Sequence, residues 1–122
     1  MSQLDAIELK AFVPAKRFKI SKRFYQDLGF TLAWCADDLA YLRLRTCSFL
    51  LQDASQKEVP EALTMHLLVP DADVWYDLIL KRGIIETYGV QITPLVQQPW
   101  GMREFTLTDP SGVQWRIAQN ID

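Results

Sequence analysis

The sequence predicts an α+β fold built from two tandem β-α-β-β-β modules, and two observations support this. Segments that alternate apolar and polar residues, as strands do, surround two segments in which apolar residues recur at helical spacing. The tripeptide Phe12-Val13-Pro14 also recurs 56 residues later as Leu68-Val69-Pro70, and each copy precedes a helical segment. With 122 residues the chain has the size of one domain. We therefore expect a single domain over 1–122, with module one at 5–53, a linker at 54–61 and module two at 62–119.

The first module is predicted to begin with a strand at 6–13, where apolar residues alternate with Glu8, Lys10 and Phe12. Pro14 ends this strand, because proline has no backbone N–H to continue a ladder. A helix with apolar residues at helical spacing, followed by a glycine, then leads to three short strands, so the remaining elements are expected at 17–28, 30–35, 39–45 and 47–52.

The second module repeats this order after the polar linker. A strand at 63–69 stops at Pro70, and Asp71 or Asp73 can cap a helix that runs to Arg82. Three further strands are expected at 90–96, 103–108 and 113–118, with loops at 97–101 and 109–112.

The charge and hydropathy of the chain exclude two classes of partner. Thirteen Lys and Arg against fifteen Asp and Glu give a net charge of −2, which does not attract a nucleic-acid backbone. No apolar run approaches the roughly 20 residues of a membrane span, and the acidic N-terminus is unlike a secretory signal. We therefore expect a cytoplasmic protein that binds neither nucleic acid nor membrane.

The two cysteines, Cys35 and Cys47, are expected to be buried and reduced. They lack CxxC spacing, and the chain has one histidine, so they predict neither a disulfide framework nor a thiolate zinc site. A nucleophilic cysteine would have His66 as its one possible histidine base, and nothing in the sequence places the two side chains together.

Three segments carry a resemblance to a known family: Ser21-Lys-Arg-Phe-Tyr-Gln-Asp-Leu-Gly-Phe30, Trp100-Gly-Met-Arg-Glu-Phe105 and Asp109-Pro-Ser-Gly-Val-Gln-Trp115. In this order they resemble the vicinal oxygen chelate superfamily of glyoxalases, bleomycin-resistance proteins and extradiol dioxygenases. The resemblance covers nearly the whole chain and is closest in look to the bleomycin-resistance-like branch. It implies that the modules form a curved mixed sheet around a ligand cavity, within a homodimer.

The resemblance also raises the question of a metal. In the catalytic members, His or Glu on the first strand of each module and Glu on the last strand hold a divalent ion. Carried over to this chain, these positions hold Lys10, Leu50, His66 and Arg116. Placing Lys10 or Arg116 about 4 Å from a dication would cost roughly 8 kcal/mol at an effective dielectric near 20. Although Glu8 or Glu104 could replace a missing ligand, the sequence leads us to assign no metal ligand, no catalytic residue and no cofactor, and does not favour an enzyme.

A binding cavity then remains as the predicted site. Strand alternation places Lys10 and Phe12 on one face of the first module, and His66 and Arg116 on the matching face of the second. Arg116 must meet water, an internal glutamate or an anionic ligand, because a buried unpaired guanidinium is unstable. Trp100 lies in a loop where no periodicity requires an aromatic residue, which favours binding. Trp34 and Tyr41 could line the cavity or close the core.

The sequence thus predicts a metal-free, homodimeric small-molecule-binding protein that sequesters a drug-like, small aromatic or anionic compound in a basic and aromatic cavity. Phe12 and Trp100 would stack on the ligand, while Lys10, His66 and Arg116 would contact its polar groups. One alternative is a metal-dependent lyase, thiol transferase or dioxygenase. Others are a metal-free isomerase with His66 as base, and a regulatory or structural dimer with a vestigial cavity.

Overall fold

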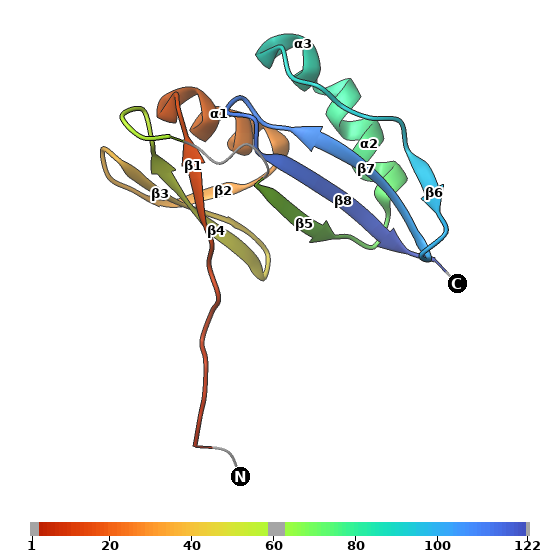
Figure 1. Ribbon diagram of the computed structural model, residues 1–122, viewed down its shortest axis with the longest axis horizontal. Helices are drawn as coiled ribbons and strands as arrows, with labels where there is room; N and C mark the ends of the chain where they lie inside the picture. Colours follow the sequence, from red (N-terminus) through yellow and green to blue (C-terminus); the bar gives the residue numbers. More distant parts are fainter. Residues whose placement is uncertain (1–2, 59–62, 122) are drawn as a thin grey trace.

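Two four-stranded sheets and three helices make up the fold in a computed structural model that describes residues 3–58 and 63–121 (Figure 1). The first module consists of β1 (Phe12–Ala15), α1 (Phe18–Leu28), β2 (Thr31–Cys35), β3 (Leu39–Leu44) and β4 (Cys47–Asp53). The second consists of β5 (Thr64–Leu68), α2 (Ala72–Lys81), α3 (Ile84–Tyr88), β6 (Val96–Gln98), β7 (Met102–Thr108) and β8 (Gln114–Asn120). The two predicted tandem modules are confirmed. The predicted linker, 54–61, extends at 59–61 outside the described residues.

The two sheets have the same topology. Sheet 1 has the strand order β1-β4-β3-β2, and sheet 2 has the order β5-β8-β7-β6. In each sheet the first strand pairs in parallel with the last strand of its module, and the remaining pairs are antiparallel. This correspondence is the structural form of the sequence repeat. Among the described residues, no helix is long and apolar enough to cross a membrane.

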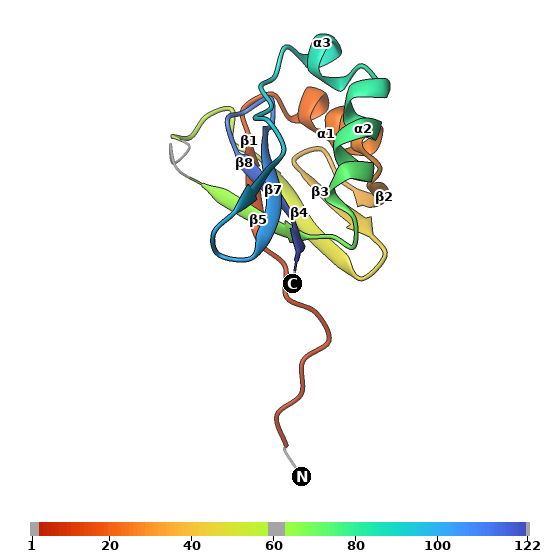
Figure 2. The same cartoon turned by 90° about the vertical axis from the view of Figure 1, so that its right-hand side faces the viewer.

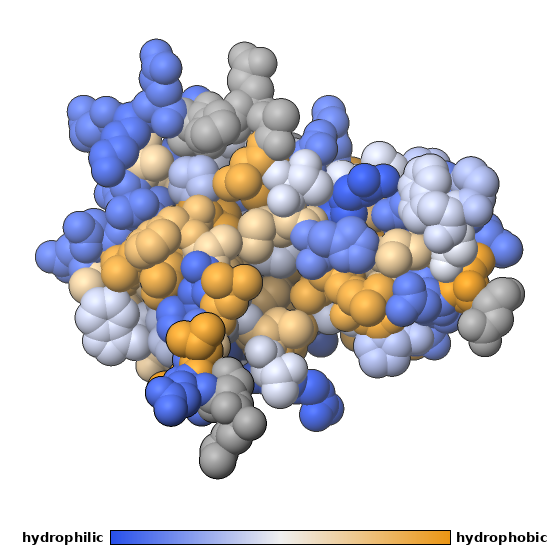
Figure 3. Space-filling view, turned by 60° about the horizontal axis from the view of Figure 1, so that its bottom comes forward, coloured by the Kyte–Doolittle hydropathy of each residue, from blue (hydrophilic) through white to orange (hydrophobic). Residues whose placement is uncertain are grey.

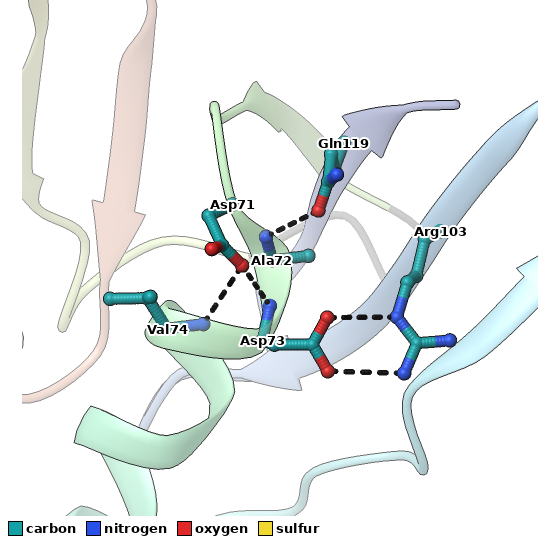
Figure 4. Close-up of polar contacts among 6 residues, drawn as sticks. All are labelled: Asp71, Ala72, Asp73, Val74, Arg103 and Gln119. Carbon is teal, nitrogen blue, oxygen red and sulfur yellow. Dashed lines mark hydrogen bonds and ion pairs between the residues drawn. The ribbon is translucent and has the colours of Figure 1, made fainter. Parts of the chain in front are cut away.

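The N-terminus of α2 is fastened to sheet 2 by side-chain contacts (Figure 4). The carboxylate of Asp71 accepts hydrogen bonds from the backbone N–H groups of Asp73 and Val74, at 3.1 and 3.3 Å, as a helix cap does. The Arg103 side chain on β7 donates two hydrogen bonds to the Asp73 carboxylate, at 2.9 and 3.0 Å. Of the two predicted caps, Asp71 therefore caps the helix, while Asp73 ties it to the sheet.

The helix-facing sides of both sheets share one aromatic core. The Tyr25 ring on α1 lies 4.8 Å from the Phe49 ring of sheet 1 and 5.5 Å from the Trp115 ring of sheet 2, measured between centroids. The Tyr25 hydroxyl donates a hydrogen bond to the buried carboxylate of Asp109 and accepts one from Trp115 Nε1 at 2.8 Å. Burial raises the pKa of Asp109. This cluster fixes the two modules against each other and leaves the opposite sheet faces uncovered.

The predicted first strand, 6–13, is wrong in extent, because β1 begins at Phe12. The residues before it leave sheet 1 as an extended arm (Figures 1 and 2), on which Ile7 and Leu9 are fully exposed rather than packed against a helix. The register explains this difference for residues 6–8. Phe12 pairs with Leu50, and β4 begins three residues before Leu50, so residues 6–8 extend past the end of their partner strand.

The predicted strand at 90–96 is also wrong. This segment follows α3, which periodicity did not indicate, and joins β7 through a single bridge between Ile92 and Leu107. Pro94 offers no N–H to continue the ladder, so the strand forms later, as β6, which begins at the last residue of the predicted strand and extends into the predicted loop at 97–101. The two cysteines are free as expected but exposed, contrary to the prediction, because Cys35 and Cys47 lie at strand ends.

Candidate functional site

Each sheet packs one face against the helices and leaves the other face open, and the predicted ligand residues lie on or beside these open faces. In Figure 1 the helices lie above the sheets and the arm extends below them. Figure 3 looks at the side from which the arm leaves, where apolar side chains gather in a band next to the arm. Phe12 and Trp100 are both more than half exposed, as a stacking role requires.

A row of large side chains crosses the open face of sheet 1. The strand register places Phe12 opposite Leu50, Leu50 opposite Tyr41, and Tyr41 opposite Trp34. Cross-strand neighbours share a face, so these four residues form a strip, here called the aromatic row. Trp34, like Phe12, is more than half exposed. The sequence left Trp34 and Tyr41 undecided between cavity and core, and the pairing register resolves both in favour of the open face.

The carboxylate of Glu8, on the arm, accepts hydrogen bonds from three side chains, one of which, Tyr41, belongs to the aromatic row. Glu8 accepts hydrogen bonds from Lys10 Nζ at 3.0 Å, from the Tyr41 hydroxyl at 2.8 and 2.9 Å, and from the Ser48 hydroxyl. These hydrogen bonds, Ser48 contributing most, lower the pKa of Glu8 to about 2. Lys10 Nζ also lies 5.1 Å from the centre of the Tyr41 ring. Lys10 is therefore an ion-paired cation, and Glu8, Lys10, Tyr41 and Ser48 are here called the Glu8 cluster.

A second carboxylate organises the open face of sheet 2. Glu104 lies in the middle of β7 with its side chain 5% exposed, and its Oε1 accepts hydrogen bonds from Trp100 Nε1 at 2.9 Å and Arg116 Nη2 at 3.4 Å. The Arg116 guanidinium carbon lies 5.9 Å from the centre of the Trp100 ring, and the Arg116 side chain is 44% exposed. Of the partners considered for Arg116, the structure therefore provides an internal glutamate. These three residues are here called the Glu104 cluster.

His66 belongs with the Glu104 cluster rather than with Lys10. It is exposed on β5, directly opposite Arg116, which in turn lies opposite Thr106. Its side chain makes no hydrogen bond or ion pair within the described ranges. No such contact and no ring contact joins Lys10 or Phe12 to the Glu104 cluster in the part of the chain that the structure describes. One chain thus presents the predicted ligand residues as two separate groups.

The strand register changes the residue assigned to one of the four positions at which catalytic members of the superfamily hold their metal. When Val13-Pro14 is superposed on Val69-Pro70, the equivalent of Arg116 is Ser48 rather than Leu50, because β1 and β4 share the register of β5 and β8. Comparison of the amino-acid sequences of the two last strands placed this position two residues further along β4, at Leu50.

The donors at these positions do not fit a divalent metal. They are Lys10, Ser48, His66 and Arg116, of which only the imidazole is a good ligand. Both cations are already paired with carboxylates. Across residues 3–58 and 63–121, no three His, Cys, Asp or Glu side chains form a group that could hold a metal ion. We therefore derive no chemistry through a metal.

The duplicated module, with helices on one side and open sheet faces on the other, defines the class of fold, and a family model assigns it. The chain belongs to the glyoxalase/bleomycin resistance protein/dioxygenase superfamily, whose model matches residues 8–117. The resemblance inferred from the sequence is thereby confirmed. No curated protein sequence matches the chain significantly.

Solved structures confirm the fold at low sequence identity. A bleomycin-binding protein complexed with bleomycin is 22% identical, with a TM-score of 0.81, covering 94% of this chain and 99% of its own. The bleomycin-binding protein of Streptomyces verticillus, complexed with copper(II)-bleomycin, is 19% identical, with a TM-score of 0.76 and coverage of 98% and 99%. A lactoylglutathione lyase from Agrobacterium tumefaciens is 16% identical, with a TM-score of 0.73 and coverage of 97% and 96%.

Proposed function

We propose that the protein binds a flat small molecule without a metal, in a cavity formed between the open faces of sheet 1 and sheet 2. The observation that carries this proposal is the pairing of exposed rings with charged groups on both faces, at and around the positions where catalytic relatives hold a metal. Phe12 and Trp100 stack on the ligand, while Lys10, His66 and Arg116 meet its polar groups. Two similar structures contain bleomycin, which supports a binding role over a catalytic one.

A homodimer is part of the same proposal, because one chain leaves the site incomplete. Within the described residues no hydrogen bond, ion pair or ring contact joins the aromatic row to the Glu104 cluster, and the arm exposes Ile7 and Leu9 completely. Apolar side chains at alternating positions of an extended segment are typical of a strand that lacks its partner. A second copy that covers the arm would bury Ile7 and Leu9 and could bring its own sheet 2 towards this sheet 1. The cytoplasmic location predicted from the sequence fits this role.

The dimer is tested by the mass of the protein in solution. The double variant Ile7→Ser, Leu9→Ser is expected to sediment as a monomer at a concentration at which the natural chain is dimeric. Leu80→Ser, an equally polar change at an exposed apolar residue of α2, is the matched control and should leave the dimer intact. A monomeric natural chain, or a double variant that remains fully dimeric, would refute the proposed assembly.

The binding role is tested by quenching of tryptophan fluorescence with 2-naphthamide. Saturable quenching is expected in the natural chain and should be largely lost in Trp100→Phe. It should persist in Trp75→Phe, which removes a half-buried indole from the helix side. Metal analysis of the same samples should find no stoichiometric Ni, Zn, Mn or Fe. Absence of quenching, or a stoichiometric metal, would overturn the proposal.

A further inference from the structure

We infer that Glu104 determines which ligands the site accepts, by holding Trp100 and Arg116 in a charge-neutral unit that prefers uncharged planar ligands to anions. The inference rests on the proposed function, because it concerns the same open face of sheet 2. It narrows the ligand class, since the sequence alone allowed an aromatic or an anionic molecule.

The position of Glu104 is unusual for a carboxylate. It projects from a central strand onto a face that is open to solvent, yet its side chain is 5% exposed. A carboxylate this well covered requires hydrogen-bond donors, because burying an unpaired charge is costly. Its side-chain donors are Trp100 and Arg116, two of the residues that the proposed function places against the ligand.

Both donors use the same oxygen, which fixes their relative placement. The indole N–H and the guanidinium meet at Glu104 Oε1, so the Arg116 guanidinium carbon lies 5.9 Å from the indole centre. Trp100 lies in the turn between β6 and β7, and Gly101 beside it has a φ of 82°, which favours glycine. Glu104 thus orders an exposed loop aromatic before any ligand arrives, which reduces the entropy lost on binding.

The ion pair also determines the charge that a ligand meets. Arg116 and Glu104 together carry no net charge, so a ligand carboxylate approaching the guanidinium is also repelled by the Glu104 carboxylate. Arg116 has five N–H donors and gives one hydrogen bond to Glu104, so others remain for a neutral acceptor such as a carbonyl or a ring nitrogen. A flat ligand can therefore lie on the indole and accept from Arg116 without bearing a charge.

A glutamate on the helix side of the protein, Glu86, provides a matched control for this inference. Glu86 is exposed on α3, and no hydrogen bond, ion pair or ring contact joins it to Trp100 or Arg116 among the described residues. Glu8 does not serve as this control, because it pairs with Lys10, which the proposed function places against the ligand. Glu104→Gln and Glu86→Gln are the same chemical change, and both keep a side-chain oxygen that can accept a hydrogen bond. Only the first should alter the preference of the Trp100 face.

The binding experiment compares two probes with the same ring system, neutral 2-naphthamide and anionic 2-naphthoate. The natural chain should bind the amide more tightly. Glu104→Gln should raise the affinity for 2-naphthoate by about tenfold, since it removes the repelling charge, and change the affinity for the amide by less than about twofold. Glu86→Gln should leave the ratio unchanged. An unchanged ratio in Glu104→Gln, or a natural chain that prefers 2-naphthoate, overturns the inference and leaves the proposed function standing.

A second readout needs no ligand and separates the two proposals. The indole N–H proton of Trp100, assigned by its disappearance in Trp100→Phe, should shift and exchange faster with water in Glu104→Gln than in Glu86→Gln. An indole signal that is the same in the natural chain and in both glutamine variants contradicts the positioning role of Glu104. Failure of both probes to bind the natural chain, with the indole signal responding as expected, refutes the proposed function and with it the ligand preference.

Discussion

The open faces of the two sheets use the same kinds of groups but hold them differently. Each combines a carboxylate, a cation and aromatic rings, as expected for the two halves of a duplicated fold. Glu104 belongs to a central strand of sheet 2 and is 5% exposed, whereas Glu8 belongs to the arm and is 26% exposed. The face of sheet 2 is therefore complete within the sheet and its hairpin turn, while the face of sheet 1 depends on where the arm lies. Duplication has given one self-contained face and one that needs a neighbouring segment.

The largest effect on stability is expected at Tyr25, which packs against the helix-facing sides of both sheets. Tyr25→Phe removes the donor to buried Asp109 and the acceptor of Trp115 Nε1. We expect a loss of about 3 kcal/mol in the free energy of unfolding, because the buried Asp109 carboxylate would lose the donor to its Oδ2 and the buried Trp115 indole would lose its acceptor. The backbone N–H groups of Ser111 and Val113 would still donate to Asp109 Oδ1. Urea denaturation measures this loss. Tyr88→Phe, which removes a more exposed hydroxyl bonded to Asp27 at 2.5 Å, is the control and should cost less than about 1 kcal/mol. Equal losses of unfolding free energy in Tyr25→Phe and Tyr88→Phe would contradict the importance of the Tyr25 hydrogen bonds.

A smaller effect on stability is expected when the two carboxylates, Glu104 and Glu8, are removed one at a time, and the two losses should differ. Glu104→Ala leaves Trp100 and Arg116 without their common acceptor, and we expect it to lower the free energy of unfolding by about 1.5 kcal/mol. Glu8→Ala should cost less, because the Glu8 cluster is exposed to water. Thermal and urea unfolding of both variants test this order. A larger loss in Glu8→Ala would reverse the contrast between the two faces.

The smallest effect concerns the acid titration of Glu8. Its pKa is lowered to about 2, so its contribution to stability is complete above its ordinary value of 4.5 and is lost as the pH falls from there towards 2. Ser48 contributes most to this shift, and Ser48→Ala should move the pKa back towards 4.5. Carbon-13 NMR of the Glu8 carboxyl group follows the titration. A natural chain that titrates near 4.5 would mean that the cluster is not formed in solution.

Much of the fold could be predicted from the sequence, because periodicity reports which side chains share a face. The order of the modules, the cap at Asp71 and the exposure of Trp100 followed from local pattern. The extent of the strand predicted at 6–13 could not be derived from local pattern, because alternation of apolar and polar residues does not report how far a partner strand extends. Pro94 similarly interrupts a segment with strand-like composition. Both errors concern pairing, which depends on residues far along the chain.

The predicted site was incomplete for the same reason. The sequence identified Arg116 and considered Glu104 as its partner, but the hydrogen bond from Trp100 to Glu104 depends on the turn between β6 and β7. Their four-residue spacing across a hairpin turn was the available signal. The aromatic row could be assembled only from the ladder that links Phe12 to Trp34 across sheet 1.

Titration of the metal-free protein with 2-naphthamide tests the central claim most directly. The natural chain is treated with a chelator, and quenching is followed alongside Trp100→Phe. We expect saturable binding that the chelator leaves unchanged and that the variant largely loses. Binding that appears only when a divalent metal is restored, with that metal bound to the chain, would contradict the account.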